Sequence, residues 1–260
     1  MYNLPQMTSK TTCHEDVEAE IHARMAEIGV AGILSESELI QRSRSWGGCD
    51  VYRWRLPSGH ECLVKSLQNR PFWVRLLYGS RTLKAEDANL RMLRDHGVRV
   101  PQPYGMADKN NLLEEYLGDG KVLLSLRHYT EKTKPPREFF QRLSDMIMSM
   151  HDNGICHGDF HRANVMILGD GEPCLLDVAT AMHVTETSSW LDKLLFGMFR
   201  RADVFSLARI VESFYPEMID VRLAEALKKA PWYLRIGRFL RHRIYRRIRG
   251  KRKRASAQID

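Results

Sequence analysis

Apolar residues near the N-terminus recur every three or four positions, with charged residues between them. This period predicts an amphipathic helix over residues 14–28. Glycines at positions 29 and 32 should end the helix, because glycine is a poor helix former. The expected apolar face consists of Val17, Ile21, Met25 and Ile28.

The next apolar pattern has a period of two. Residues 51–56 alternate between apolar and polar side chains, and residues 61–67 do so again. Pro57-Ser58-Gly59 lies between the two segments and favours a turn. Together these features predict a β-hairpin with Lys65 on its second strand.

Two longer segments, residues 82–96 and 137–151, return to helical spacing. Gly97, followed by prolines at 101 and 103, favours the end of the first of these helices. A short strand is predicted between them, over residues 112–117. The expected buried positions of the two helices are Leu83, Leu90, Leu93, Phe140, Leu143, Ile147 and Met150.

A second and smaller hairpin is predicted in the C-terminal half. Residues 165–168 and 174–176 are short apolar runs, and Gly169-Asp170-Gly171 between them favours a turn. From residue 188 onward the pattern is helical to the end of the chain. The strand-rich first half and the helical second half meet at a glycine-containing joint near residues 117–121.

We therefore expect an α+β fold of two lobes, with a ligand-binding cleft between them. The expected parts are an N-terminal helical extension (1–38), a small β-rich lobe (39–117), a larger and mainly helical lobe (118–230) and a C-terminal tail (231–260). At 260 residues the chain is long enough to bury a substantial core.

Composition favours a globular protein of a reducing compartment. Hydrophobic residues make up 43% of the chain and charged residues 28%. The five cysteines are scattered without a CxxC pair, which argues against a disulfide framework or a structural zinc site. Neither a signal peptide nor an apolar run of about 18 residues is recognisable. We expect a cytoplasmic protein, free or peripheral on the cytoplasmic face of the inner membrane.

Charge is concentrated in the tail. Residues 235–254 contain eleven Lys or Arg and no acid, whereas the whole chain has a formal net charge of +8. Apolar residues recur among these arginines at three- and four-residue spacing, from Trp232 to Ile248. Such a basic amphipathic helix suits an anionic membrane surface, where each cation contributes about 1 kcal/mol. Packing on the larger lobe is an alternative, and nucleic acid is the least favoured partner.

The candidate chemistry lies in the segment His-Gly-Asp-Phe-His-Arg-Ala-Asn at residues 157–164. Asp159 can accept the proton of an attacking hydroxyl, which makes it the candidate catalytic base. Asn164 and Asp177 can supply the oxygen ligands that Mg²⁺ prefers. This spacing of two carboxylates and an amide is typical of phosphoryl transfer from ATP. The alternatives are a turn residue for Asp159, a turn-capping amide for Asn164 and a helix cap for Asp177.

Further candidates for nucleotide binding lie upstream. Lys65 could anchor the phosphates if an acid on the following helix orients it, and Glu86 is the expected partner, with Asp87 as its competitor. Gly47 and Gly48 could cover the phosphates with backbone N–H groups, although a plain turn is an equal alternative. The segment from Glu115 to Leu117 could bind the adenine edge through its backbone.

At these residues the chain resembles the protein-kinase-like superfamily, and His-Gly-Asp in place of His-Arg-Asp resembles its branch that acts on small molecules and glycans. Within that branch it is most similar to the lipopolysaccharide core kinases, from about residue 45 to 215. This resemblance implies a two-lobed kinase fold, the cofactors ATP and Mg²⁺, and a heptose or Kdo sugar of the inner core as acceptor. The roles given above to Asp159, Asn164, Asp177, Lys65 and Glu86 match those of the family.

The chain departs from protein kinases in two places. Asp177-Val178-Ala179 lacks the glycine of the Asp-Phe-Gly motif, and His161 stands where many protein kinases have a lysine. His161 and Arg162 could neutralise phosphoryl charge or lie on the surface. Two other functions stay open: a nucleotide-binding pseudokinase or membrane-bound scaffold, and a kinase of a soluble small molecule. Residues 190–199 could contact an acceptor or lipid, with core packing as the default.

Overall fold

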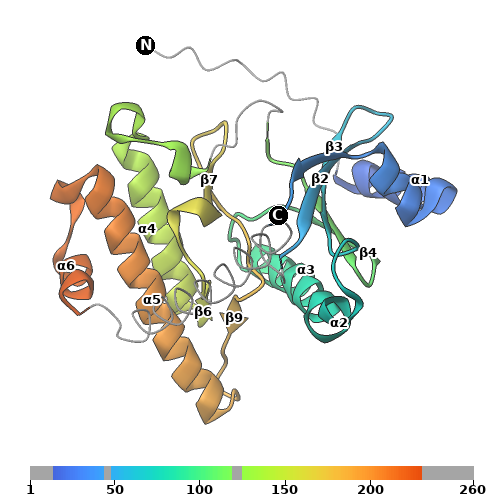
Figure 1. Ribbon diagram of the computed structural model, residues 1–260. Helices are drawn as coiled ribbons and strands as arrows, with labels where there is room; N and C mark the ends of the chain where they lie inside the picture. The colour runs from blue at the N-terminus through green and yellow to red at the C-terminus, as the bar shows by residue number, and fades with distance from the viewer. Residues whose placement is uncertain (1–13, 44–47, 119–124, 230–260) are drawn as a thin grey trace, which may run out of the picture.

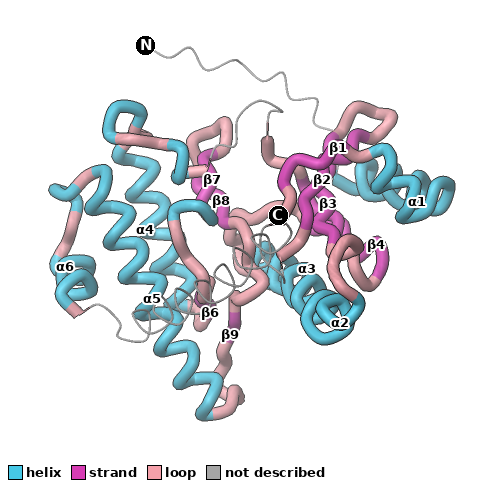
Figure 2. The backbone as a smooth tube through the Cα atoms, in the orientation of Figure 1, coloured by secondary structure: helices cyan, strands magenta, loops and turns pink. Residues whose placement is uncertain are grey.

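The computed structural model describes residues 14–43, 48–118 and 125–229 (Figure 1). The five-stranded sheet and the N-terminal helices lie on one side of the molecule and the C-terminal helices on the other, so the expected two-lobed α+β fold is confirmed (Figure 2). The sheet lies within the part of the chain that we assign to the smaller lobe, and the helices α4 to α6 lie within the larger one. The basic tail lies outside the described residues.

The smaller lobe is built on a five-stranded antiparallel sheet with the order β1-β2-β3-β5-β4. Its strands are β1 (Glu38–Gln41), β2 (Asp50–Arg55), β3 (Glu61–Ser66), β4 (Pro103–Asp108) and β5 (Asn111–Glu115). The predicted hairpin is confirmed as β2 and β3, with Val51 opposite Lys65. Two strands of this sheet were not predicted: β1 is exposed along its length, and β4 contains Pro103 and Gly105, so neither has the alternation that reveals a strand.

The two faces of this sheet carry different helices. Val64 and Leu113 pack with helix α1 (His14–Glu36) around Trp54, whereas Leu112 packs with Leu83 of α3 (Ser80–Asp95). Because side chains alternate along a strand, Lys65 and Glu114 share the face of Leu112 and point toward α3. Before α3 the chain forms the short helix α2 (Phe72–Val74) and the π-turn η1 (Arg75–Gly79).

The N-terminal helix is longer than the sequence predicted. Gly29, with φ +64° and ψ 177°, interrupts it as expected, but a second helical segment continues to Glu36. The expectation that Gly32 also ends the helix was wrong, because the second segment runs through it. This segment buries Ile33 beside Val17 and Ile21, and that burial outweighs the weak helix preference of glycine.

The larger lobe packs around helices α4 (Arg137–Asp152), α5 (Trp190–Phe214) and α6 (Val221–Lys228). All the apolar positions predicted for α4 are buried, with Phe140 in contact with Phe214 and Tyr215. The second predicted hairpin is confirmed as β7 (Val165–Ile167) and β8 (Pro173–Leu175). The remaining elements are β6 (Ile155–Cys156), β9 (Met182–His183), and the short helical turns η2 (Leu126–His128), η3 (Glu131–Thr133), η4 (Arg162–Asn164) and η5 (Pro216–Met218).

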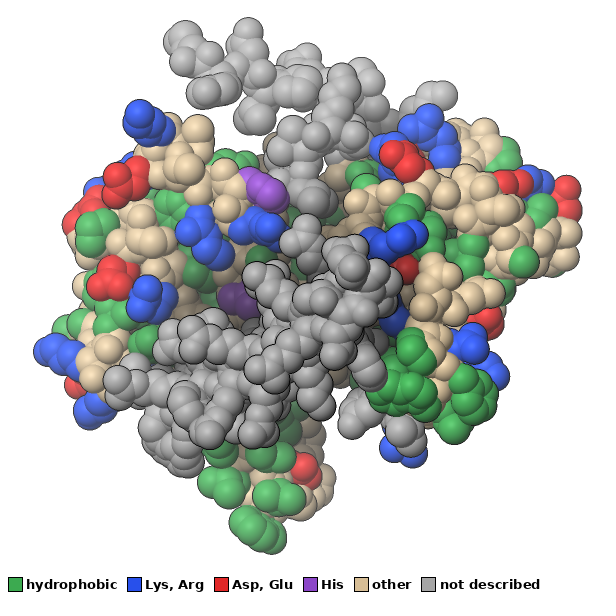
Figure 3. Space-filling model, in the orientation of Figure 1, with side chains coloured by type: hydrophobic (Ala, Val, Ile, Leu, Met, Phe, Trp, Pro, Cys, Tyr) green, Lys and Arg blue, Asp and Glu red, His purple; other side chains and the backbone are tan. Residues whose placement is uncertain are grey.

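Helix α5 is buried only in its second half. Trp190 is 76% exposed and Leu194 is 54% exposed, so the default expectation of core packing for residues 190–199 was wrong. Figure 3 shows apolar side chains at the lower end of the molecule, where Figure 1 places the start of α5. Even so, none of the helices in the described ranges is both long and apolar enough to cross a membrane.

Truncation of Phe140 should destabilise the larger lobe strongly. Phe140→Ala removes a fully buried ring that touches three other aromatic rings, and it should lower the free energy of unfolding by about 3–5 kcal/mol. Urea denaturation measures this change. The neighbouring exposed Gln141→Ala is the matched control and should change stability by less than about 0.5 kcal/mol. Equal effects of the two substitutions would contradict the packing described here.

Candidate active site

Lys65 lies at the centre of a cluster of charged side chains in the candidate site. Its ammonium lies 2.5 Å from Oε1 of Glu86 on α3 and 2.9 Å from Oε1 of Glu114 on β5. The structure thus pairs Lys65 with Glu86 rather than with Asp87, whose carboxylate lies beside Arg91. Sequence reasoning missed Glu114. Its period-two relation to Leu112 was the available signal for a carboxylate on the inner face of the sheet.

The charges of this cluster act on one another strongly. Burial alone would lower the pKa of Lys65, but Glu114 and Glu86 more than offset it and raise the pKa above its usual value. Lys65 therefore stays an ammonium ion at every physiological pH. Asp177 acts on this ammonium in the same direction, so the Asp177 carboxylate lies within electrostatic reach of Lys65.

The candidate catalytic loop, residues 157–164, is anchored by Asp203 of α5. The Asp203 carboxylate is buried and accepts hydrogen bonds from the backbone N–H of His157 (2.7 Å) and of Gly158 (3.2 Å). His151 of α4 lies 3.4 Å from the same carboxylate. Sequence reasoning missed Asp203, although an acid flanked by apolar residues on a helix was a possible signal.

His157 and Gly158 fix the shape of the loop. The buried His157 ring contacts the Leu176 carbonyl oxygen at 3.0 Å, and the His157 carbonyl oxygen accepts a hydrogen bond from Thr180. Gly158 has φ +79°, and a Cβ there would lie 2.6 Å from the Thr180 carbonyl oxygen. Only glycine fits this backbone without strain. His157 thus supports the loop.

Asn164 joins the catalytic loop to the strand that carries Asp177. The Asn164 side-chain amide N–H donates to the backbone carbonyl oxygen of Asp159 (3.0 Å). The backbone carbonyl oxygen of Asn164 accepts a hydrogen bond from the Leu176 N–H (2.9 Å). Asp177 follows directly, with the unusual positive φ of 55°. The Asp159 side chain is half exposed and has His161 as its neighbour at 4.0 Å.

The residues present fit a hard divalent cation. The Asn164 amide group donates through nitrogen, which leaves its oxygen available, and the Asp177 carboxylate has no hydrogen bond or ion pair among those found in the described chain. Within these ranges no group of three or more His, Cys, Asp or Glu side chains is arranged to hold a metal ion. A cation here would take one amide and one carboxylate, with water and phosphate as further ligands, as Mg²⁺ commonly does.

Asn89 of α3 links the two lobes at this point. Its side-chain amide donates to the carbonyl oxygens of Val178 (2.9 Å) and Ala181 (3.0 Å), which follow Asp177. The helix that holds Glu86 therefore also holds the segment after Asp177. Sequence reasoning missed Asn89, for which no local signal existed.

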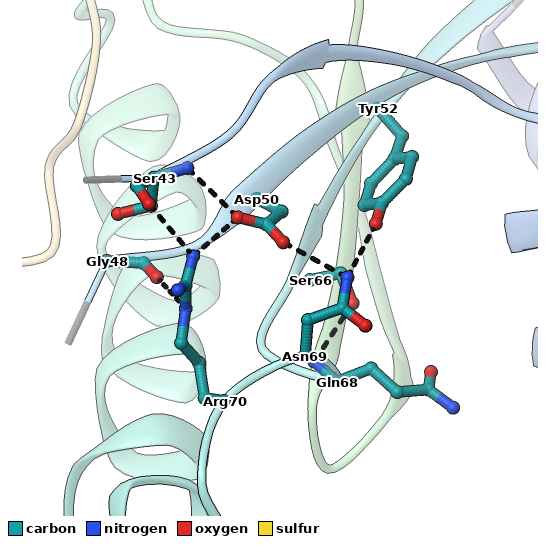
Figure 4. A network of polar contacts seen from close by, with 8 residues as sticks. All are labelled: Ser43, Gly48, Asp50, Tyr52, Ser66, Gln68, Asn69 and Arg70. Atoms are coloured by element: carbon teal, nitrogen blue, oxygen red, sulfur yellow. Dashed lines mark hydrogen bonds and ion pairs between the residues drawn. The ribbon is translucent and has the colours of Figure 1, made fainter. Parts of the chain in front are cut away.

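The stems of the predicted phosphate-covering loop are tied together by a polar network (Figure 4). Arg70 donates to the carbonyl oxygen of Gly48 (2.8 Å) and forms an ion pair with the buried Asp50, which also accepts the N–H of Ser43 (2.9 Å). Gly47 lies outside the described residues. This network holds the two sides of the loop close together, whatever the conformation of its tip.

The joint between the lobes is held at Glu115. Its N–H donates to the Gln102 carbonyl oxygen (2.8 Å), while its carboxylate accepts the N–H of the same residue (3.0 Å). Leu117 follows and is partly buried. The Arg162 guanidinium donates to the backbone carbonyl oxygens of Leu126 and Tyr129 and stacks over Phe214.

Removal of the Asp203 carboxylate should release the catalytic loop. Asp203→Ala leaves the N–H groups of His157 and Gly158 buried without their acceptor, and it should lower the free energy of unfolding by about 2–5 kcal/mol. Denaturation with urea measures the loss. Glu212→Ala on the exposed face of the same helix is the control, and a comparable loss there would contradict the proposed anchoring.

Comparison with known proteins relates about half of the chain to one domain family. Residues 76–204 match the RIO domain family. The chain is 30% identical over 92 residues to serine/threonine-protein kinase rio2 of Schizosaccharomyces pombe, covering 35% of this chain and 25% of that protein. It is also 30% identical over 105 residues to RIO-type serine/threonine-protein kinase Rio1 of Haloferax volcanii, covering 39% and 34% of the two chains.

The matched segments span about a quarter to a third of the length of these curated relatives. Both relatives are named as RIO kinases, and neither is named as a lipopolysaccharide kinase. The expected superfamily is therefore confirmed, whereas the closer resemblance to the lipopolysaccharide core kinases is not. The match includes the helix of Glu86, the catalytic loop, Asp177 and Asp203, but begins after Lys65. Residues 76–204 are thus similar to the RIO domain of the protein-kinase-like superfamily.

Proposed function

We propose that the protein is an ATP- and Mg²⁺-dependent kinase that transfers the γ-phosphoryl group to an alcohol hydroxyl. The observation that carries this proposal is that Asp177 lies within electrostatic reach of the Lys65–Glu86 ion pair and is joined to the Asp159 loop through Asn164. A phosphoryl transfer enzyme needs mainly alignment and charge neutralisation, and this arrangement supplies both.

Each residue has a defined task in this proposal. Asp159 accepts the proton of the acceptor hydroxyl, and its half-exposed carboxylate is open to an incoming substrate. Lys65, oriented by Glu86, holds the phosphates, while Gly47 and Gly48 cover them and the Glu115 to Leu117 backbone holds the adenine. Asn164 and Asp177 hold Mg²⁺, which when bound neutralises the phosphate charge.

For the acceptor we propose a sugar hydroxyl, in first place a heptose or Kdo of the lipopolysaccharide inner core. The sequence resemblance of residues 45–215 supports this choice, as does His161 in place of the lysine of many protein kinases. The names of the relatives favour a second candidate, a serine or threonine hydroxyl of a protein. The two acceptors require the same chemistry and differ only in the group that must bind near Asp159.

A lipid-linked acceptor also fits the surface of the protein. The basic tail and the exposed apolar start of α5, with Trp190, Leu191 and Leu194, suit a peripheral position on the cytoplasmic face of an anionic membrane. The soluble small-molecule kinase and the pseudokinase are the competing functions.

Substitution of the base should abolish turnover without abolishing nucleotide binding. Asp159→Ala should lower kcat about 10²–10⁴-fold, because general base catalysis typically contributes that much. The dissociation constant for ATP should change less than about twofold, since Asp159 faces the acceptor. Asp152→Asn, at the exposed end of α4, is a control for the loss of one charge. Near-normal turnover by Asp159→Ala would refute the assignment of the base.

The acceptor can be identified directly. Purified inner-core glycolipid should stimulate ATP consumption, and a library of Ser- and Thr-containing peptides should not. Core oligosaccharide from a strain without this protein should also lack one phosphate by mass spectrometry. Stimulation by peptides alone would replace the sugar with a protein acceptor, and no consumption with any acceptor would favour the pseudokinase.

Deletion of residues 235–260 should reduce partitioning into vesicles that contain anionic lipid. The deleted segment holds most of the basic residues that would contact the membrane, at about 1 kcal/mol each. A full-length variant with Gln at those Lys and Arg positions controls for chain length. Unchanged partitioning of both variants would remove the argument for a lipid-linked acceptor.

A further inference from the structure

Glu114 is a buried carboxylate with no role in the mechanism above. It is 4% exposed, and only its Oε1 has a partner, the ammonium of Lys65. Its second oxygen, Oε2, is buried and has no hydrogen-bond partner within the described ranges. An unpaired oxygen on a buried carboxylate is costly, so this residue requires an explanation.

The geometry places two carboxylates on one ammonium. Leu63 lies opposite Glu114 and Leu112 lies opposite Lys65, so Lys65 and Glu114 are diagonal neighbours on one face of the sheet. Glu86 reaches the same ammonium from α3. One positive charge thus balances two negative charges, and the Asp177 carboxylate adds a third within electrostatic range.

These groups make the ionised form of Glu114 unfavourable. Burial raises the pKa of Glu114, Lys65 lowers it, and Glu86 and Asp177 raise it again, with a net rise to about 7. Cys49 also lies in this neighbourhood, but burial and Glu86 raise its pKa to about 12, so the thiol stays neutral. The attraction of Lys65 is therefore what keeps Glu114 ionised near neutral pH.

A bound phosphate would compete for that attraction. The phosphate adds negative charge beside the Lys65 ammonium. Of the two carboxylates that share this ammonium, Glu114 is then the weaker partner. Glu86, which already accepts the shorter contact, remains to orient the lysine. The least costly response of Glu114 is to take a proton onto the unpaired Oε2.

We propose that Glu114 is a positioning residue that shares Lys65 with Glu86 in the empty protein and takes up one proton when nucleotide phosphates bind. The inference rests on the proposed nucleotide site and deepens it. It predicts that nucleotide affinity depends on pH through a residue that touches no part of the reacting hydroxyl. Below the pKa of Glu114 the residue is already neutral, and above it each binding event must take up a proton.

The test is calorimetric titration of the full chain with MgADP between pH 6 and pH 8.5, in buffers of different ionisation enthalpy. The parent protein should take up close to one proton above pH 7, and its affinity should fall by up to about tenfold per pH unit there. Glu114→Gln keeps the shape but cannot titrate, so it should show less uptake and a flatter pH profile. Adenosine, which has no phosphate, should bind without proton uptake through Glu114.

Asp87→Asn on α3 is the matched control, because it removes one carboxylate that pairs with Arg91 instead of Lys65. It should behave like the parent protein. Should Glu114→Gln fold poorly, Glu114→Met removes the carboxylate without burying an amide, and the same profile is expected.

Two results would overturn the inference. Identical proton uptake and pH profiles in the parent and in both Glu114 variants would exclude Glu114 as the group that titrates. Equal proton uptake with adenosine would exclude the phosphates as the cause. If the parent binds no nucleotide at all, the proposed function falls together with this inference, whereas normal binding with unchanged linkage rejects the inference alone.

Discussion

The ammonium of Lys65 is the interaction on which the arrangement of the site depends. Lys65 belongs to the sheet and Glu86 to α3, so their ion pair fixes the helix against the sheet at one point. The same helix holds the segment after Asp177 through Asn89. A charge in the smaller lobe and a candidate metal ligand in the larger lobe are therefore positioned by one rigid element.

A buried ion pair of this kind contributes little net stability, because the loss of hydration offsets most of the attraction. The ion pair instead fixes the position of Lys65 relative to α3. The second carboxylate, Glu114, makes the pair less stable than Glu86 alone would, since two acids cannot both be fully satisfied by one lysine. Natural proteins retain such local conflicts mainly at functional sites. The cluster is thus consistent with a protein in which Lys65 has a further, anionic partner to bind.

The lower half of the site follows a different principle, because it depends on backbone hydrogen bonds rather than on charge pairs. Asp203 accepts two N–H groups of the catalytic loop, Gly158 adopts a backbone conformation that a side chain would strain, and Asn164 ties the loop to the strand before Asp177. These contacts leave the Asp159 carboxylate exposed while its backbone is held. A rigid loop with one free carboxylate is what positional catalysis requires.

The comparison with the RIO kinases bears on the chemistry more than on the substrate. The matched residues include the Asp159 loop, the candidate metal ligands and the helix of Glu86, which are the residues that our proposal assigns to the nucleotide. The tail lies outside the matched range. Acceptor choice depends on surfaces near Asp159 and on the tail, so it can differ between proteins that share this domain.

Local patterns in the sequence were sufficient to predict much of the fold. Period two revealed β2 and β3, helical spacing revealed α3 and α4, and the glycine at position 97 ended α3 as expected. The pairing of Lys65 with Glu86 and the closeness of Asn164 to Asp177 also followed from the order of these elements. Strands β1 and β4 could not be predicted, because exposed or proline-containing strands lack alternation.

The contacts of Glu114, Asn89 and Asp203 were decided by the tertiary structure alone. Each acts across a long stretch of chain: Asn89 meets the segment after Asp177, and Asp203 meets the catalytic loop. The sequence determines which side chains can carry charge and which segments are strands or helices, because those preferences are local. Which buried acid meets which cation or N–H depends on how lobes and strands pack, and packing brings together residues that share no local pattern.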